Sequence, residues 1–211
     1  MHALKTLALS FAVAFFALSP AIAAAADSDP AARKIESFYA TLLDTMKRGH
    51  ELGVKGRYQA MAPAVDATFD LPTMIKFIVG TGWSTMSDAD HKALAEAFRR
   101  MTIANYAGNF DSFNGQRFDV DPNVQTKGTD RFVQSTLVPK GDNPIPFIYR
   151  MRDMGGDWKA IDIYLNGYVS ELATRRSDFA STLASGGASA LVKKLNELAD
   201  NALAGSKSGA D

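Results

Sequence analysis

The stretch IPFIYRMRDMGGDWKAIDIYL at residues 145–165 decides the fold. In its first half, every second residue is apolar and would lie on one face: these are Ile145, Phe147, Tyr149 and Met151. In its second half, alternate positions place on one face Ile161, Ile163 and Leu165. Alternation with a period of two is typical of a strand that buries one face. Because a glycine pair at 155–156 lies between the halves and favours a tight turn, the stretch predicts an antiparallel hairpin.

Two more strands are expected upstream of this hairpin, at residues 116–121 and 131–138. The run Gly-Asp-Asn-Pro at 141–144 supplies a turn before the hairpin begins. Short connections of this kind join strands that run in opposite directions. The sequence therefore predicts a four-stranded antiparallel sheet.

The residues before the sheet have the three-and-four spacing of helices. Asp29 suits a helix cap and Pro30 the first helical position. Ser87, with Asp90 three residues later, has the form of a capping box. Pro63 is expected to interrupt the second of the predicted helices. These helices span residues 29–49, 57–67, 69–78 and 87–110.

Two helices are expected after the sheet, at residues 169–187 and 191–202, with Gly186-Gly187 ending the first. Helices, then a sheet, then helices predict an α+β domain in which helices pack on one face of a curved four-stranded antiparallel sheet. We expect this domain to span residues 27–204. Residues 205–211 are expected to form a disordered tail.

The first 26 residues have the features of an export signal. Lys5 supplies the positive charge, an uncharged run follows at residues 7–18, and Pro20 comes after it. The alternative is a membrane anchor, but a spanning helix needs about 20 apolar residues and this run has about twelve. We therefore predict a signal peptide at 1–26, a mature protein that starts between Ala24 and Asp27, and a periplasmic location.

Composition excludes several classes of protein. The chain contains no cysteine, so no disulfide can form within it. It has 23 basic and 23 acidic side chains, with no block of like charge. A nucleic-acid-binding protein would gather basic residues on one face, so that class is excluded.

The sequence lacks the residues typical of catalytic and metal-binding sites. Beyond the predicted signal peptide the histidines are His50 and His91, and neither neighbours a residue pattern typical of an activated nucleophile. Two histidines without cysteine do not favour a zinc site. No glycine-rich phosphate loop occurs either. The sequence therefore predicts a protein that is not an enzyme, with no cofactor and no metal.

Phenylalanine and methionine are frequent, with 13 and eight residues in the chain. Methionine adapts to irregular cavities and flexible ligands. The same composition also fits an ordinary filled core, and on composition alone the two interpretations remain open.

A series of landmarks runs through the predicted domain: Phe69-Asp70, Gly82-Trp83, Ser87, Phe98, Tyr106, Trp158, Asp162, Gly167, the run from Arg176 to Phe179, and Leu191 to Leu195. In their order and spacing these landmarks resemble the MlaC family, also called the toluene-tolerance auxiliary family. That family is the periplasmic lipid-binding component of the Mla (maintenance of lipid asymmetry) transport system. The resemblance covers most of the predicted domain.

The resemblance implies a function and partners. A family member holds the acyl chains of a lipid in an apolar cavity between a curved sheet and helices. It exchanges that lipid with an inner-membrane ABC transporter complex and with outer-membrane partners, as a monomer. Here Gly167-Tyr168-Val169-Ser170 carries one residue more than the usual form and resembles the hopanoid-associated HpnM branch. Phospholipid and hopanoid are therefore both candidate ligands.

Two alternatives to a lipid carrier remain. One is a structural or adaptor protein of the cell envelope, with a filled core and protein partners alone. The other is an enzyme built on a related scaffold, because a fold does not fix a function.

The resemblance and the apolar patterning together predict the lining of a lipid cavity. The expected residues are Met74, Ile78, Phe98, Met101, Tyr106, Phe147, Tyr149, Met151, Ile161 and Ile163.

Three further residues are expected at the cavity mouth, where a headgroup and partners would meet. Tyr168 combines an aromatic ring with a polar tip, which suits a boundary between dry and wet surroundings. Arg175 and Arg176 cannot both face inward on one helix. One of them could bind phosphate or dock on the transporter, because a guanidinium presents a bidentate fork. The alternative is a structural ion pair for Arg176 and a solvated charge for Arg175.

Overall fold

The computed structural model describes residues 28–205. The predicted signal peptide at 1–26 and residues 206–211 of the predicted tail lie outside this range. Among the described residues, no helix has both the length and the apolar character needed to cross a bilayer.

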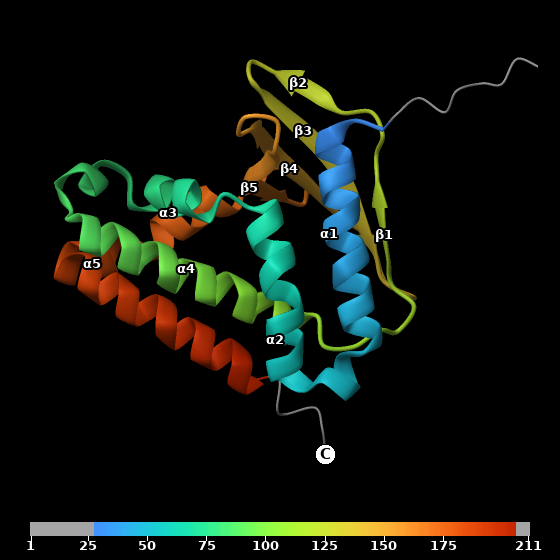
Figure 1. The fold of residues 1–211 in the computed structure, drawn as a ribbon, viewed down its shortest axis with the longest axis horizontal. Helices are drawn as coiled ribbons and strands as arrows, with labels where there is room; N and C mark the ends of the chain where they lie inside the picture. Colours follow the sequence, from blue (N-terminus) through green and yellow to red (C-terminus); the bar gives the residue numbers. More distant parts are fainter. Residues whose placement is uncertain (1–27, 206–211) are drawn as a thin grey trace, which may run out of the picture.

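Two antiparallel helices open the fold, α1 (Pro30–Lys47) and α2 (Gly49–Thr68) (Figure 1). The side chain of Asp29 caps α1 by accepting a hydrogen bond of 2.8 Å from the backbone N–H of Ala31. Helix α2 kinks at Gly53, where φ is 58°.

Helix α2 then continues through Pro63, so the predicted interruption at this residue is wrong. Met61 and Val65, one on each side of Pro63, are fully buried in the core. This packing holds the two flanking turns in place although proline removes one hydrogen-bond donor.

A short helix, a 3₁₀ turn and a long helix follow: α3 (Leu71–Val79), η1 (Gly80–Thr85) and α4 (Asp88–Asn109). The predicted capping box is confirmed at the start of α4. The backbone N–H of Asp90 donates to Ser87 Oγ at 3.1 Å, and the backbone N–H of Ser87 donates to Asp90 Oδ2 at 3.2 Å.

The sheet has six strands in the described chain, two more than predicted. They are β1 (Arg117–Val120), β2 (Gln125–Lys127), β3 (Asp130–Val138), β4 (Ile145–Asp153), β5 (Trp158–Leu165) and β6 (Val169–Ser170). All pair antiparallel in the order β1-β3-β4-β5-β6, and β2 also pairs with β3. The antiparallel prediction is confirmed. Strands β2 and β6 escaped prediction because three and two residues are too short to display an alternating pattern.

A β-bulge interrupts the pairing of β4 with β5. Arg150 pairs with Asp162 and Met151 with Ala160, so Ile161 has no partner on β4. An extra residue of this kind reverses the facing of the residues on one side of it. As a result, Ile163 faces the helices and Ile161 faces the opposite side, which corrects the prediction that the two share one face.

Helix α5 (Glu171–Gly205) completes the fold and breaks at Gly187, where φ is 60° and ψ is −150°. The prediction of two helices meeting at the glycine pair is therefore confirmed. The second segment ends at Gly205, which is the first residue of the predicted tail.

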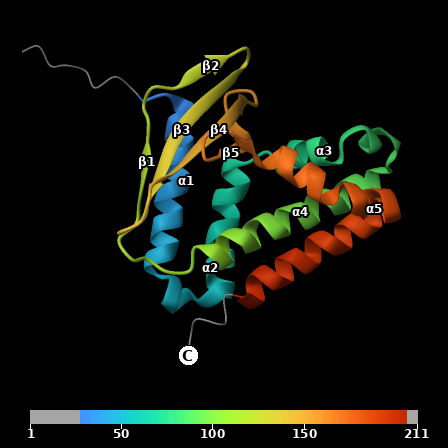
Figure 2. The ribbon, with the colours of Figure 1, turned by 180° about the vertical axis from the view of Figure 1, so that it is seen from behind.

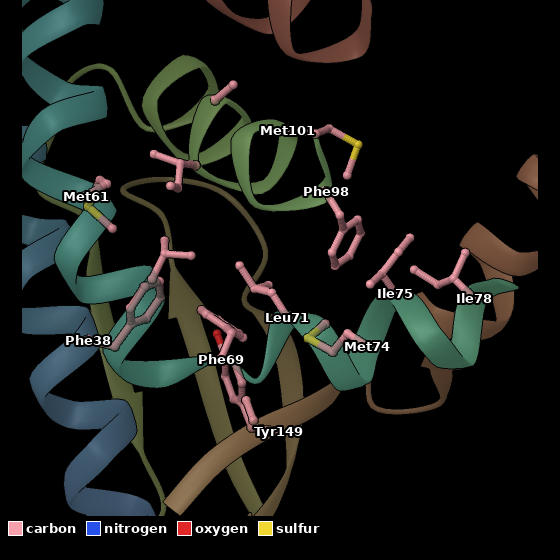
Figure 3. Close-up of a cluster of buried hydrophobic side chains, with 14 of the residues drawn as sticks. Phe38, Met61, Phe69, Leu71, Met74, Ile75, Ile78, Phe98, Met101 and Tyr149 are labelled. Carbon is pink, nitrogen blue, oxygen red and sulfur yellow. The ribbon is translucent and has the colours of Figure 1, made fainter. Parts of the chain in front are cut away.

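The helices pack on one face of the sheet, as predicted. Helix α1 lies against the strands, whereas α4 and α5 lie side by side and extend away from them (Figures 1 and 2). Buried side chains fill the space where α1, α2, α3 and α4 meet (Figure 3). Phe38 lies near the centre, with its ring 5.3 Å from that of Phe69 and 5.1 Å from that of Tyr106.

Candidate ligand cavity

An apolar cavity of about 250 Å³ lies between the sheet and the helices. Side chains from α1, α3, α4, β1, β4, β5 and the first turns of α5 line it. It is partly enclosed by protein and partly open to solvent. Seven of the ten residues predicted for the lining contribute to it: Met74, Phe98, Met101, Tyr106, Phe147, Tyr149 and Ile163.

The sheet wall of the cavity comes from two neighbouring strands. On β4 and β5, Phe147 pairs with Leu165 and Tyr149 pairs with Ile163. Directly paired residues project from the same face of a sheet, so these four side chains form one continuous apolar surface. The bulge places this set on the cavity side.

The helix wall comes mainly from α4. Its lining residues recur at three-and-four spacing, which places them on one face of the helix. They are Phe98, Met101, Thr102, Asn105, Tyr106 and Asn109, and Phe110 follows directly after the helix. Met74 of α3 joins this wall and is buried, as are Phe98 and Met101 (Figure 3).

A network of hydroxyl groups lies in the cavity wall. The hydroxyl oxygens of Tyr39 and Tyr149 are 2.9 Å apart, and the Tyr39 hydroxyl is 2.7 Å from Ser135 Oγ. Burial raises the pKa of Tyr39 to about 12 and raises the pKa of Tyr106 and Tyr149 as well. All three phenols are therefore neutral near pH 7.

One part of the lining is polar and charged. Asn105 and Asn109 of α4 lie on this side with Glu171 and Arg175 of α5. Arg175 Nε is 3.6 Å from a carboxylate oxygen of Glu171, and both side chains are partly exposed. This arrangement gives an apolar interior with a polar rim, which is the usual form of a small-molecule site.

Three predicted lining residues do not reach the cavity. Ile78 and Met151 are fully buried in the filled part of the core. Ile161 faces the other side of the sheet because of the bulge and lines a shallow depression there with Phe77 and Tyr164. Sequence spacing could not tell filled core from cavity for Ile78 and Met151, and it assigned Ile161 to the wrong face of the sheet.

The residues predicted for the mouth lie in three different surroundings. Tyr168 is 78% exposed, directly after a tight turn that its backbone N–H closes by donating to the Leu165 carbonyl at 3.2 Å. Arg175 lines the cavity. Arg176 is exposed beside Gly80, where an added Cβ would lie 2.8 Å from its guanidinium, and it makes no ion pair with any described residue.

These positions bear on the structural alternative for the two arginines. The ion pair belongs to Arg175, with Glu171, and Arg176 carries the solvated charge. That alternative assigned the two roles the other way round.

Several lining residues were not predicted from the sequence. They are Tyr39, Leu42, Thr102, Asn105, Asn109, Phe110, Phe118, Leu165, Glu171 and Leu172. Leu165 had a usable signal, because it alternates with Ile163 in the printed sequence. Tyr39 and Leu42 carried the helical pattern of α1, but nothing local indicates that α1 packs against this cavity.

His50 and His91 lie outside the cavity. His91 Nε2 is 2.8 Å from the Trp83 carbonyl oxygen, and its ring stacks on that of Trp83 at 4.1 Å. His50 is exposed in α2. Within residues 28–205, no group of three or more histidine, aspartate or glutamate side chains is arranged to hold a metal ion.

Comparison with known proteins agrees with this architecture. Among solved structures, the chain is similar to the phospholipid-binding protein from Ralstonia solanacearum, solved in complex with a phospholipid, with a TM-score of 0.71. Sequence identity is 21%, over 82% of this chain and 98% of that chain, and at this level the likeness shows the fold. No curated protein gives a significant match. The model of the MlaC protein family matches residues 36–197, well over half of the sequence, and the chain therefore belongs to the MlaC family.

Proposed function

We propose that this protein is a periplasmic lipid carrier. It holds the apolar part of a phospholipid or hopanoid in the cavity and shuttles the lipid between the inner and outer membranes with an ABC transporter. The observation that carries the proposal is the open apolar cavity with a polar rim, in a chain of the MlaC family. The protein binds and releases its ligand without chemical change, so it is not an enzyme.

The free energy of lipid transfer explains why such a carrier is needed. Each methylene removed from water is worth about 0.8 kcal/mol, so a chain of about 16 carbons represents roughly 12 kcal/mol. A lipid therefore leaves a bilayer for water very slowly. A carrier overcomes this by offering a dry surface comparable to the bilayer interior.

The size of the cavity bears on how the lipid is loaded. The cavity of about 250 Å³ lies below the range of about 300–1,000 Å³ typical of sites for drug-sized ligands, so it encloses only a short acyl chain. A longer chain must extend through the open side or move the helices apart. We infer that loading widens the cavity between α4, α5 and the sheet.

Two candidate ligands follow from different observations. The similar fold of the Ralstonia solanacearum protein, solved with a phospholipid, supports a phospholipid. The longer form of the segment from Gly167 to Ser170 supports a hopanoid. Both present a large apolar body with a polar end, which matches the apolar interior and the rim formed by Glu171 and Arg175.

The first experiment identifies the ligand. The protein is purified from the periplasm without detergent, extracted with organic solvent and analysed by mass spectrometry. We expect one molecule of phospholipid or hopanoid per chain. Lipid-free protein from cells that make both lipids would contradict the proposal and favour an adaptor with protein partners alone.

A matched pair of variants then locates the ligand. Phe147→Asp places a charge in the cavity wall, whereas Ile148→Asp places the same charge on the opposite face of the same strand. Both residues are partly buried. We expect Phe147→Asp to lose the bound lipid and Ile148→Asp to keep it, with circular dichroism showing that both variants fold. Equal lipid content in the two variants would remove the cavity from the proposal.

Shuttling is tested separately. Lipid-loaded protein is mixed with vesicles that contain the purified inner-membrane transporter, and lipid exchange is followed by fluorescence. We expect exchange to require the transporter. Exchange at the same rate with vesicles that lack it would leave a lipid-binding protein that is not a transporter partner.

A further inference from the structure

Three hydroxyl groups form a chain in the wall of an otherwise apolar cavity. Ser135 Oγ, the Tyr39 hydroxyl and the Tyr149 hydroxyl are linked by contacts of 2.7 and 2.9 Å. Each hydroxyl has one hydrogen to donate. The three hydroxyls have three hydrogens between them but form only two hydrogen bonds with one another. One hydrogen is therefore left without an acceptor among the described residues.

The geometry assigns that hydrogen to Tyr149. The Tyr39 hydroxyl donates to Tyr149, so its own oxygen accepts from Ser135 Oγ. The hydrogen of Tyr149 is then unused. Tyr149 is only 3% exposed and lines the cavity, and its side chain points from the sheet toward Phe69 (Figure 3).

Tyr106 provides a second unused donor on the opposite wall. Its ring packs against Phe38 and Phe110, with centroids 5.1 and 5.9 Å away. Its hydroxyl makes no hydrogen bond to any described residue, although the side chain lines the cavity. The rings of Tyr106 and Tyr149 both pack against the ring of Phe69, with centroids 6.0 and 6.4 Å away.

Packing alone does not account for these hydroxyls. Phenylalanine fills nearly the same volume, and the neighbouring Phe38, Phe69 and Phe110 show that it is accepted in this part of the interior. A buried donor without an acceptor is unfavourable compared with an apolar group of the same shape. Both side chains line the cavity, so a lipid that displaces water from it must offer their hydroxyls an acceptor or leave them unpaired.

We propose that Tyr106 and Tyr149 donate hydrogen bonds to an uncharged oxygen atom on the buried part of the lipid, and that this pair selects lipids that carry such an oxygen. The inference rests on the proposed function and adds the chemistry of the ligand. Two sources supply the oxygen: an ester carbonyl of a phospholipid, or a hydroxyl of a hopanoid. A saturated hydrocarbon body without oxygen would leave both donors unpaired.

The phenols of Tyr106 and Tyr149 stay protonated near neutral pH. Burial raises the pKa of both phenols far above neutral pH, so neither ionises. The selection is therefore expected to be constant between about pH 5 and pH 8.

The experiment compares lipids that differ in this oxygen alone. Mature protein is loaded from mild detergent with equimolar pairs, and the bound lipid is extracted and quantified by mass spectrometry. The first arm pairs dipalmitoyl phosphatidylglycerol with its dihexadecyl ether, which lacks the carbonyls. The second pairs diplopterol, an alcohol, with the hydrocarbon diploptene. We expect about 3- to 10-fold enrichment of the oxygen-bearing lipid in one arm, and that arm identifies the source.

Variants that each lack one tyrosine hydroxyl test which residue causes the enrichment. Tyr106→Phe and Tyr149→Phe each remove one hydroxyl and should reduce the enrichment toward equal loading. Tyr164→Phe is the matched control, because Tyr164 is partly buried on the opposite face of the sheet and should keep the full enrichment. Thermal unfolding of each variant checks that the fold is retained.

Two results would overturn the inference while leaving a lipid carrier in place. One is equal loading of both members in both arms. The other is enrichment that persists in Tyr106→Phe and Tyr149→Phe, which would assign the selection to another group of the cavity. A protein that takes up none of the four lipids would instead contradict the proposed function.

Discussion

The two faces of the sheet come from the same strands, but one lines a cavity and the other carries a cluster of ion pairs. The face toward the helices carries Phe147, Tyr149 and Ile163 and leaves a cavity. The other face carries Asp130, which is buried between Arg150 and Arg152. Asp130 receives hydrogen bonds of 2.6 Å from Arg150 Nε and 2.7 Å from Arg152 Nε.

The contrast shows how a sheet can tolerate an unfilled side. Charge-assisted hydrogen bonds hold β3 and β4 in register from the outer face. On the same face Asp162 accepts hydrogen bonds from Ser170 Oγ at 2.7 Å and from the backbone N–H of Leu172 at 3.2 Å, which holds the start of α5. Because the outer face secures these strands, the inner face is free to exchange packing for a ligand.

Breaking the outer face is expected to have the largest effect on stability. Asp130→Asn removes the charge that compensates both arginines. Breaking a buried ion pair usually costs 3–5 kcal/mol, and since Arg150 and Arg152 are partly exposed to water we expect about 2–4 kcal/mol here. Urea unfolding measures this loss. Lipid content should stay at the parental level, because the change lies on the face away from the cavity.

The dependence of stability on pH provides the control for this prediction. Hydrogen bonding from Arg152 lowers the pKa of Asp130 below its ordinary value. A carboxyl with a lowered pKa stabilises the fold above its unfolded pKa of about 3.9, and this stabilisation is lost as the pH falls through the lower folded value. The parental protein should therefore lose stability more steeply below about pH 4 than Asp130→Asn. Equal acid sensitivity would show that Asp130 does not anchor the strands.

Replacing isoleucine with the larger phenylalanine tests which positions lie in filled core and which lie beside the cavity. Ile75 is fully buried in the filled core, whereas Ile163 lines the cavity. Ile75→Phe should cost about 1–3 kcal/mol because the added atoms have no room. Ile163→Phe should cost under about 1 kcal/mol and lower the lipid content, since the ring occupies the cavity. Thermal unfolding and lipid extraction measure the two effects, and equal destabilisation would mean that no usable space exists beside Ile163.

The smallest effects are expected from the two arginines at the start of α5. Arg175 faces the cavity and Arg176 faces outward beside Gly80. Exchanging either for glutamine should change stability by no more than about 0.5 kcal/mol, because both lie at the surface. We expect Arg175→Gln to retain anionic phosphatidylglycerol less well and Arg176→Gln to retain it fully but exchange it more slowly with the transporter. Parental retention and exchange in both variants would assign these residues to the fold alone.

Much of the fold could be predicted from local patterns. The alternation at residues 145–165, the capping box at Ser87 and the glycine pair before Ala188 each report on a few neighbouring residues. Such signals depend on backbone conformation and on which face of an element is apolar. Seven of the ten predicted lining residues reach the cavity for the same reason, since an apolar face must meet either the core or a ligand.

Tertiary structure alone decided the rest. The bulge that turns Ile161 away from the cavity depends on how β4 pairs with β5, and no alternating pattern records it. Tyr39 and Ser135 are 96 residues apart in sequence and are joined by a hydrogen bond only after α1 packs on β3. A cavity is the space left when several elements meet, so the sequence alone indicates which side chains are apolar, and the packing decides which of them have room beside them.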